Sequence, residues 1–212
     1  MLATQLWLLL ATPVCVTFAL RGPLPEFVGA APASVRASWT IVLGASACVC
    51  AAVALSATDV AAAGALVFLC LLARLAVIDA ICLAVPVRLT VALAGAGVVF
   101  AALTGGFALG GFRLLVAILA WAGFRALDAA FAKLRGRTGL GAGDALIAAA
   151  IGAWLGPLGL AWAIALGGFA TLIWAAASGR LRAGAPFAFA PGLAVGAFGA
   201  LISQQFGEAW TW

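Results

Sequence analysis

The sequence predicts an all-α integral membrane protein with about eight transmembrane helices and its N-terminus outside. Of the 212 residues, 67% are hydrophobic and only 8% are charged, whereas a soluble domain carries roughly 25% charged residues. The mean hydropathy is +1.27, and the apolar residues are grouped in runs close to the ~20 residues that one helix needs to cross a bilayer. The chain is therefore expected to fold within a membrane, in contact with its lipids.

Eight apolar runs are expected to span the membrane. They are residues 2–20, 39–56, 61–78, 89–103, 112–130, 145–155, 158–177 and 189–204. A Gly-Gly turn follows the fourth run, and Gly156-Pro157 ends the short sixth run. Pro86 interrupts the stretch between the third and fourth runs, because proline cannot continue a helix interior. We expect residues 1–60 to form two N-terminal helices with a short cytoplasmic loop, and residues 61–212 to form a six-helix domain.

The basic residues predict the orientation. With the N-terminus outside, ten of the eleven fall in loops on the inner side: Arg21, Arg36, Arg74, Arg88, Arg125, Lys133, Arg135, Arg137, Arg180 and Arg182. Only Arg113 lies near the other side. Lys and Arg accumulate in cytoplasmic loops of membrane proteins, so Asp79 and Asp144 are expected on the cytoplasmic side.

The net charge of +5 does not indicate a nucleic-acid partner, because the basic residues stand singly or in small groups between apolar runs. The group Lys133, Arg135 and Arg137 is explained by anionic lipid headgroups, which attract a basic side chain by ~1 kcal/mol. Membrane lipids are therefore expected partners. The sequence does not predict an oligomeric state.

The residue inventory excludes several kinds of chemistry. The chain has no histidine, which rules out Ser-His and Cys-His nucleophile pairs and the usual zinc sites. Its five cysteines form no CxxC pair and are expected to be buried as small hydrophobic residues. No metal and no cofactor are expected.

The acidic residues offer the remaining chemistry. They are Glu26, Asp59, Asp79, Asp128, Asp144 and Glu208. Asp128 follows Arg125 by three residues, the spacing of an ion pair on a helix surface, and is expected to be a solvated partner of that arginine. Glu26, Asp59 and Glu208 fall in a loop or on the outer side. Asp79 and Asp144 are left, each at a cytoplasmic helix end beside a Gly or Pro break.

Asp144 stands between a glycine-rich turn and an apolar run. A carboxylate at the mouth of a membrane helix is costly and indicates function, although the residue could also serve only as a helix cap. Two carboxylates brought together share one proton, because both cannot ionise easily. One of them can then activate water while the other protonates a peptide carbonyl, as in an aspartic peptidase. Whether Asp79 and Asp144 meet is left open by the sequence.

At these residues the chain resembles the type IV prepilin peptidases, membrane aspartic peptidases with a Gly-x-Gly-Asp motif. The resemblance covers roughly residues 61–204. It rests on Gly141-Ala142-Gly143-Asp144, the flanking Lys133-Leu134-Arg135-Gly136 and Gly152-Ala153-Trp154-Leu155-Gly156, Ile78-Asp79 with Pro86 seven positions beyond the acid, and Pro186-Phe187.

The resemblance implies a leader peptidase of the bacterial inner membrane that serves type II secretion or a type IV pilus. Asp79 and Asp144 would be its catalytic pair, and Gly141, Gly143 and Pro86 are candidate substrate-binding residues. The substrate would be a prepilin or pseudopilin, cut on the cytoplasmic side after a glycine that ends its basic leader.

Two departures from the family pattern matter. Val87 stands where the family usually has Asp or Asn after the proline, so this position is not expected to bind substrate. Bifunctional members carry a cytoplasmic domain with paired cysteines between the first two spans, whereas residues 21–38 here contain no cysteine. This departure argues against N-methyltransferase activity.

Two alternatives remain open. A proton-coupled small membrane transporter also uses buried carboxylates, but it would more naturally place them near the membrane midplane. A non-catalytic subunit of a secretion system could keep the fold, but it would be expected to have lost one of the two acids.

Overall fold

The computed structural model describes residues 59–136, 139, 141–177 and 188–206, and all its elements there are helices: α4 (Asp59–Cys82), α5 (Val87–Arg135), α6 (Ala142–Ala177) and α8 (Ala190–Phe206). The predicted all-α class is confirmed for these residues. The two expected N-terminal spans lie outside the described residues, so the total of eight spans and the outside N-terminus stay predictions.

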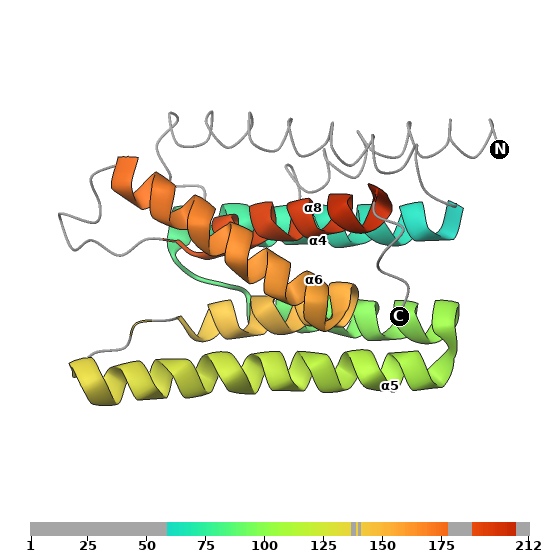
Figure 1. Cartoon of the computed structure of the whole chain (residues 1–212), viewed down its shortest axis with the longest axis horizontal. Coiled ribbons are helices and arrows are strands. Elements are labelled where there is room, and N and C mark those ends of the chain that lie inside the picture. The colour runs from blue at the N-terminus through green and yellow to red at the C-terminus, as the bar shows by residue number, and fades with distance from the viewer. Residues whose placement is uncertain (1–58, 137–138, 140, 178–187, 207–212) are drawn as a thin grey trace.

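Two of the helices are broken where the sequence predicted turns. Gly106 interrupts α5 with φ 83° and ψ 172°, and Gly156 interrupts α6 with φ 75° and ψ −173°. Glycine adopts such positive φ values without the clash that a Cβ would cause. Pro157 then begins the second half of α6, where its missing N–H costs little. Figure 1 shows α5 folded back on itself.

The described part of the chain thus contains a helical segment for each expected span beyond residue 60. One segment is in α4, two are in each of α5 and α6, and one is in α8. The last helix begins at Ala190, within one residue of the expected start. Two helices extend beyond the expected spans: the second half of α5 continues to Arg135, and α4 continues past residue 78 to Cys82 and therefore includes Asp79 in its final turn.

The helix surfaces suit a membrane. By length and composition, α5 and α6 could each cross a bilayer. Their exposed faces carry large apolar side chains, including Leu103 at 80% and Phe107 at 93% exposure. Extended apolar surface is unusual on a soluble monomer, whereas lipid tails surround it readily.

Small residues let α6 and α8 approach closely. A Cβ added to Gly167 would lie 2.5 Å from the carbonyl oxygen of Gly192, and one added to Gly196 would collide with the backbone of Ala163. Membrane helices depend on such close van der Waals packing because lipid supplies little hydrophobic drive for association. The Gly and Ala content of the sequence is therefore used in this interface.

Trp154 joins three helices in the core. Its indole stacks on Phe68 of α4 and on Phe100 of α5, with ring centroids 5.3 Å apart in both pairs. The indole N–H donates a 2.8 Å hydrogen bond to the carbonyl oxygen of Leu93. Gly97 makes room for the ring, since a Cβ there would lie 2.6 Å from it.

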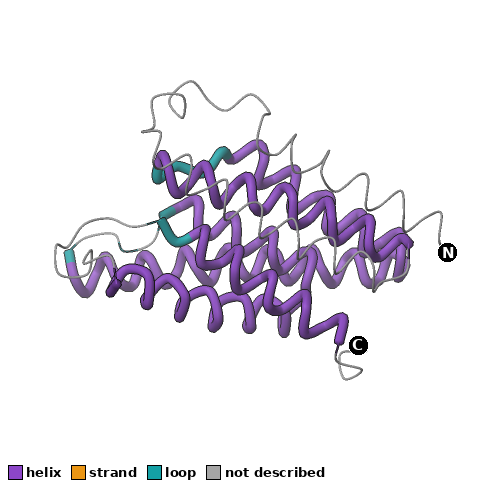
Figure 2. The backbone as a smooth tube through the Cα atoms, turned by 90° about the horizontal axis from the view of Figure 1, so that it is seen from above, coloured by secondary structure: helices purple, strands orange, loops and turns teal. Residues whose placement is uncertain are grey.

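The loops between these helices gather toward one end of the bundle. Figure 2 shows the described loop segments in teal on the same side of the molecule. The last turn of α4, the first turn of α6 and the first turn of α8 all lie near these loops (Figure 1). Asp79 and Asp144 belong to two of these turns.

We expect Trp154→Ala to destabilise the fold by about 3–5 kcal/mol, the usual cost of truncating a large aromatic side chain in a core. Thermal unfolding in detergent measures the loss as a drop of about 6 °C or more in Tm. Trp162→Ala is the matched control, because Trp162 is 45% exposed, and it should lower the Tm much less. Equal effects of the two substitutions would contradict the joining role of Trp154.

Candidate active site

Asp79 is held at the meeting point of α4 and α8. Its side chain is buried, with 6% exposure, and its Oδ2 accepts a 3.1 Å hydrogen bond from the backbone N–H of Ala190. Ala190 is the first residue of α8, and the first N–H groups of a helix lack partners within it. Asp79 therefore caps α8 from a position 111 residues earlier in the chain.

The loop after Asp79 is tightly built. Leu83 adopts a left-handed conformation with φ 51°, and its N–H donates to the carbonyl oxygen of Asp79 at 2.7 Å. Pro86 occupies the N-cap of α5, and its carbonyl oxygen accepts the Thr90 hydroxyl at 3.0 Å. The short segment between these residues presents Val85 to the start of α6.

Gly143 is the point where the two acidic segments touch. A Cβ built on Gly143 would lie 2.5 Å from both Cβ and Cγ2 of Val85. The loop that follows Asp79 therefore rests on the residue just before Asp144, and only glycine leaves the space for it. The structure thus brings together the segments of the two predicted catalytic acids.

Asp144 lies in the first turn of α6 and is partly buried. Its Oδ2 accepts the N–H of Gly141 at 3.1 Å, while its own N–H donates to the carbonyl oxygen of Gly141 at 3.1 Å. This reciprocal pair caps the helix, so the capping role considered from the sequence is present. A role as helix cap alone does not explain why the carboxyl of Asp144 lies close enough to Asp79 to be affected by its charge.

The electrostatics of the pair follow from burial and like charge. Both acids lie just beyond the apolar runs 61–78 and 145–155. Burial raises the pKa of Asp144, and the charge of Asp79 raises it further, to about 6, against the lowering effect of the Gly141 N–H. Burial also raises the pKa of Asp79, opposed by the backbone N–H groups of Ala190 and Phe189. The pair therefore retains a proton at mildly acidic pH.

The three candidate substrate-binding residues all have structural roles here. Gly141 donates its N–H to Asp144, Gly143 makes room for Val85, and Pro86 is the N-cap of α5. Contact of any of them with substrate stays a prediction. Val87, the departure from the family pattern, is the first residue of α5 and is 57% exposed.

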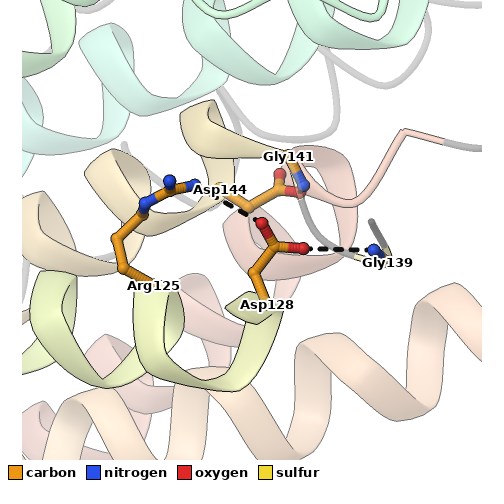
Figure 3. A network of polar contacts seen from close by, with 5 residues as sticks. All are labelled: Arg125, Asp128, Gly139, Gly141 and Asp144. Carbon is orange, nitrogen blue, oxygen red and sulfur yellow. Dashed lines mark hydrogen bonds and ion pairs between the residues drawn. The ribbon is translucent and has the colours of Figure 1, made fainter. Parts of the chain in front are cut away.

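The prediction for Asp128 was correct about its ion pair with Arg125 and wrong about its exposure to solvent. The predicted ion pair exists, with Arg125 Nη1 3.4 Å from Asp128 Oδ2, but Asp128 is buried, at 6% exposure. Its Oδ1 accepts a 3.1 Å hydrogen bond from the backbone N–H of Gly139, as Figure 3 shows. The Arg125 spacing could be read from the sequence, whereas the loop that returns over Asp128 could not.

Phe189 and Ala190 were not predicted as site residues. Their backbone N–H groups act on Asp79, and they lie just after Pro186-Phe187, which the sequence analysis noted for its resemblance. Residues 186 and 187 themselves lie outside the described residues. The resemblance was thus the one sequence signal that pointed to this part of the chain.

Known proteins resemble the region that carries these acids. A family model described as the type IV leader peptidase family matches residues 66–176. A prepilin leader peptidase/N-methyltransferase of Neisseria gonorrhoeae is 36% identical over 132 residues, which are 62% of this chain and 46% of that protein. The similarity therefore spans less than half of that relative. No solved structure matches the chain.

Asp79→Asn and Asp144→Asn should each raise the thermal stability at pH 8. A carboxyl whose pKa is raised by folding destabilises the folded state above that pKa, and the penalty fades as pH falls toward its unfolded value. For Asp144 this window runs from about pH 6 down to about 4. In the double variant the gains should fall short of additivity by about 1 kcal/mol at pH 8, because the repulsion is removed only once.

Thermal unfolding in detergent at pH 8 and pH 4 measures this coupling. The control is a cycle of Asp59→Asn with Asp144→Asn, which should be additive because Asp59 begins α4, at the end away from Asp79. Additivity of Asp79→Asn and Asp144→Asn at pH 8 would mean that the two carboxylates do not interact.

Proposed function

Since the chain belongs to the type IV leader peptidase family, we propose that it is a membrane-embedded aspartic endopeptidase that removes the leader peptide of type IV prepilins or pseudopilins. One observation carries the proposal. The loop after Asp79 rests on Gly143, so the two acids lie at one end of the bundle, on segments in direct contact. The name of the Neisseria gonorrhoeae relative supports the choice of substrate.

The reaction uses the two acids as a pair that shares one proton. The ionised carboxylate takes a proton from water, whose oxygen attacks the scissile carbonyl carbon, while the protonated partner donates its proton to the carbonyl oxygen. Collapse of the tetrahedral intermediate breaks the C–N bond: the leaving amine takes the proton that the first acid removed from water, and a hydroxyl of the intermediate returns a proton to the partner acid as the new carboxyl group forms. Backbone donors hold Oδ2 of each acid, which fixes the two carboxyl groups in place for this exchange of protons.

The position of the acids favours a peptidase over a proton-coupled carrier. Asp79 stands in the last turn of α4 and Asp144 in the first turn of α6. A carrier would use carboxylates near the midplane of its helices. A substrate peptide that projects from the membrane surface reaches helix ends more easily.

We further place the site on the cytoplasmic side of a bacterial inner membrane, in a multi-pass protein. The support is the charge distribution predicted from the sequence, which puts ten of the eleven basic residues toward the side of Asp79 and Asp144. In the structure Arg74 lies in α4, and Arg88, Arg125, Lys133 and Arg135 lie in α5. We propose leader cleavage without N-methylation, because the segment 21–38 carries no cysteine.

Incubation of the purified protein with a prepilin, followed by detection of the shortened product, tests the proposal directly. Asp79→Asn and Asp144→Asn should each abolish cleavage, because Asn keeps the shape of Asp but cannot exchange its proton. The combined substitution should lose little more than either one alone, as expected for groups that act as a unit. Normal cleavage by Asp144→Asn would refute the mechanism. Asp59→Asn is the control and should cleave like the parent.

Gly143→Ala should lower cleavage by about tenfold or more, because its new methyl displaces Val85 and separates the two acids, and misplacement by about 1 Å can cost ~100-fold. The rate should recover in part in Gly143→Ala/Val85→Gly, which removes both clashing atoms. Gly123→Ala is the control, since a Cβ there meets open space. Full activity of Gly143→Ala would show that the contact with Val85 has no role in catalysis.

A further inference from the structure

The chain between α5 and α6 is a glycine-rich connection, with Gly136, Gly139 and Gly141 among its residues. It leaves α5 through Gly136, whose φ of 68° and N–H bond to the carbonyl oxygen of Ala132 end the helix. It enters α6 at Ala142, directly before Gly143 and Asp144. Glycine loses more conformational freedom on folding than other residues, so an ordered connection here needs contacts from outside it.

Asp128 supplies such a contact from the body of α5. Each oxygen of its buried carboxylate has a partner among the described residues: Oδ2 pairs with Arg125 at 3.4 Å, and Oδ1 accepts the Gly139 N–H at 3.1 Å. The second bond joins residues 11 apart and ties the middle of the connection to the side of the helix. Figure 3 shows Arg125, Asp128 and Gly139 in one polar network, with Gly141 and Asp144 beside it.

The Phe131 ring fixes Gly139 at the same place. A Cβ added to Gly139 would lie 2.6 Å from that ring, so the glycine packs closely against Phe131, which lies three residues beyond Asp128 on α5. Two residues later, Gly141 donates its N–H to Asp144. Gly139 and Gly141 are two positions apart in the sequence, and each donates its backbone N–H to an acid, Gly139 to Asp128 and Gly141 to Asp144.

We propose that Asp128 is a positioning residue of the active site. Its carboxylate anchors Gly139, and through Gly139 it holds Gly141 and Asp144 where Asp144 meets Asp79. Arg125 binds the other oxygen and so orients Oδ1 toward the connection. Both oxygens of Asp128 have partners, which distinguishes it from an acid that must reach substrate. The catalytic consequence rests on the proposed function, whereas the anchoring of Gly139 does not.

The test compares Asp128→Ala, which removes the acceptor, with Asp128→Asn, which keeps an oxygen that can accept the Gly139 N–H. Hydrogen–deuterium exchange of a peptide that covers residues 136–144 measures the anchoring. Prepilin cleavage between pH 5 and 8 measures the consequence. We expect Asp128→Ala to speed exchange by about tenfold, the effect of one hydrogen bond, and to lower kcat by at least that factor with KM nearly unchanged.

Asp128→Asn should restore both quantities to within about threefold of the parent, because a neutral acceptor is weaker than a charged one but still present. Its rate should follow the same pH profile as the parent. If Asp128→Ala does not fold, Asp128→Ser replaces it, since a hydroxyl is too short to reach Gly139.

The outcomes separate the two proposals. Parental exchange in Asp128→Ala would overturn the anchoring role, whatever the cleavage result. If Asp128→Asn is as inactive as Asp144→Asn, or if its pH profile is shifted, Asp128 is an acid–base group. Either result would overturn the proposal that Asp128 is a positioning residue. If the parent cleaves no prepilin, the proposed function fails, and the exchange measurement alone still decides the anchoring.

Discussion

The hydrogen bond from the N–H of Ala190 to the buried carboxylate of Asp79 is the constraint on which the site depends. An ionised carboxylate away from water is costly unless it finds donors, and the start of α8 offers N–H groups that have no partner within the helix. The carboxylate of Asp79 gains a donor, and the N–H of Ala190 gains an acceptor. The bond fixes the end of α4 beside the start of α8, and this placement determines where the loop with Val85 emerges. That loop in turn reaches Gly143.

The two acids are held by similar means but in different settings. Asp79 accepts an N–H from a helix distant in sequence, and Asp144 accepts one from Gly141 in its own turn. Backbone donors favour the ionised form of each, while burial and mutual repulsion oppose it. These opposing effects let the pair retain a proton at mildly acidic pH. The same balance makes the site a source of instability, because neither carboxylate forms an ion pair with a basic residue in the part of the chain that the structure describes.

Hydropathy was sufficient to predict the helices from α4 onward, and Gly-Gly and Gly-Pro were sufficient to predict the breaks at Gly106 and Gly156. These features are local, so a single sequence contains them. The choice of Asp79 and Asp144 came from elimination and from resemblance, and their shared location needed the fold. Asp128 was misjudged because its second partner, Gly139, approaches through a loop, and a spacing rule for helices detects only Arg125. The bond from Ala190 to Asp79 could not be predicted either, because 111 residues separate the two.

The break at Gly156 leaves the first half of α6 unusually short. Residues 142–155 rise only about 21 Å at about 1.5 Å per residue, whereas the hydrocarbon core of a bilayer is about 30 Å thick. The guanidinium of Arg113 lies against the break, so a charged group also occupies that end of the short segment. Local thinning of the bilayer is one of the ways in which such a hydrophobic mismatch is accommodated. Thinning here would bring water and headgroups closer to Asp144, and the peptidase proposed above would then meet a membrane-anchored substrate without drawing it out of its lipid.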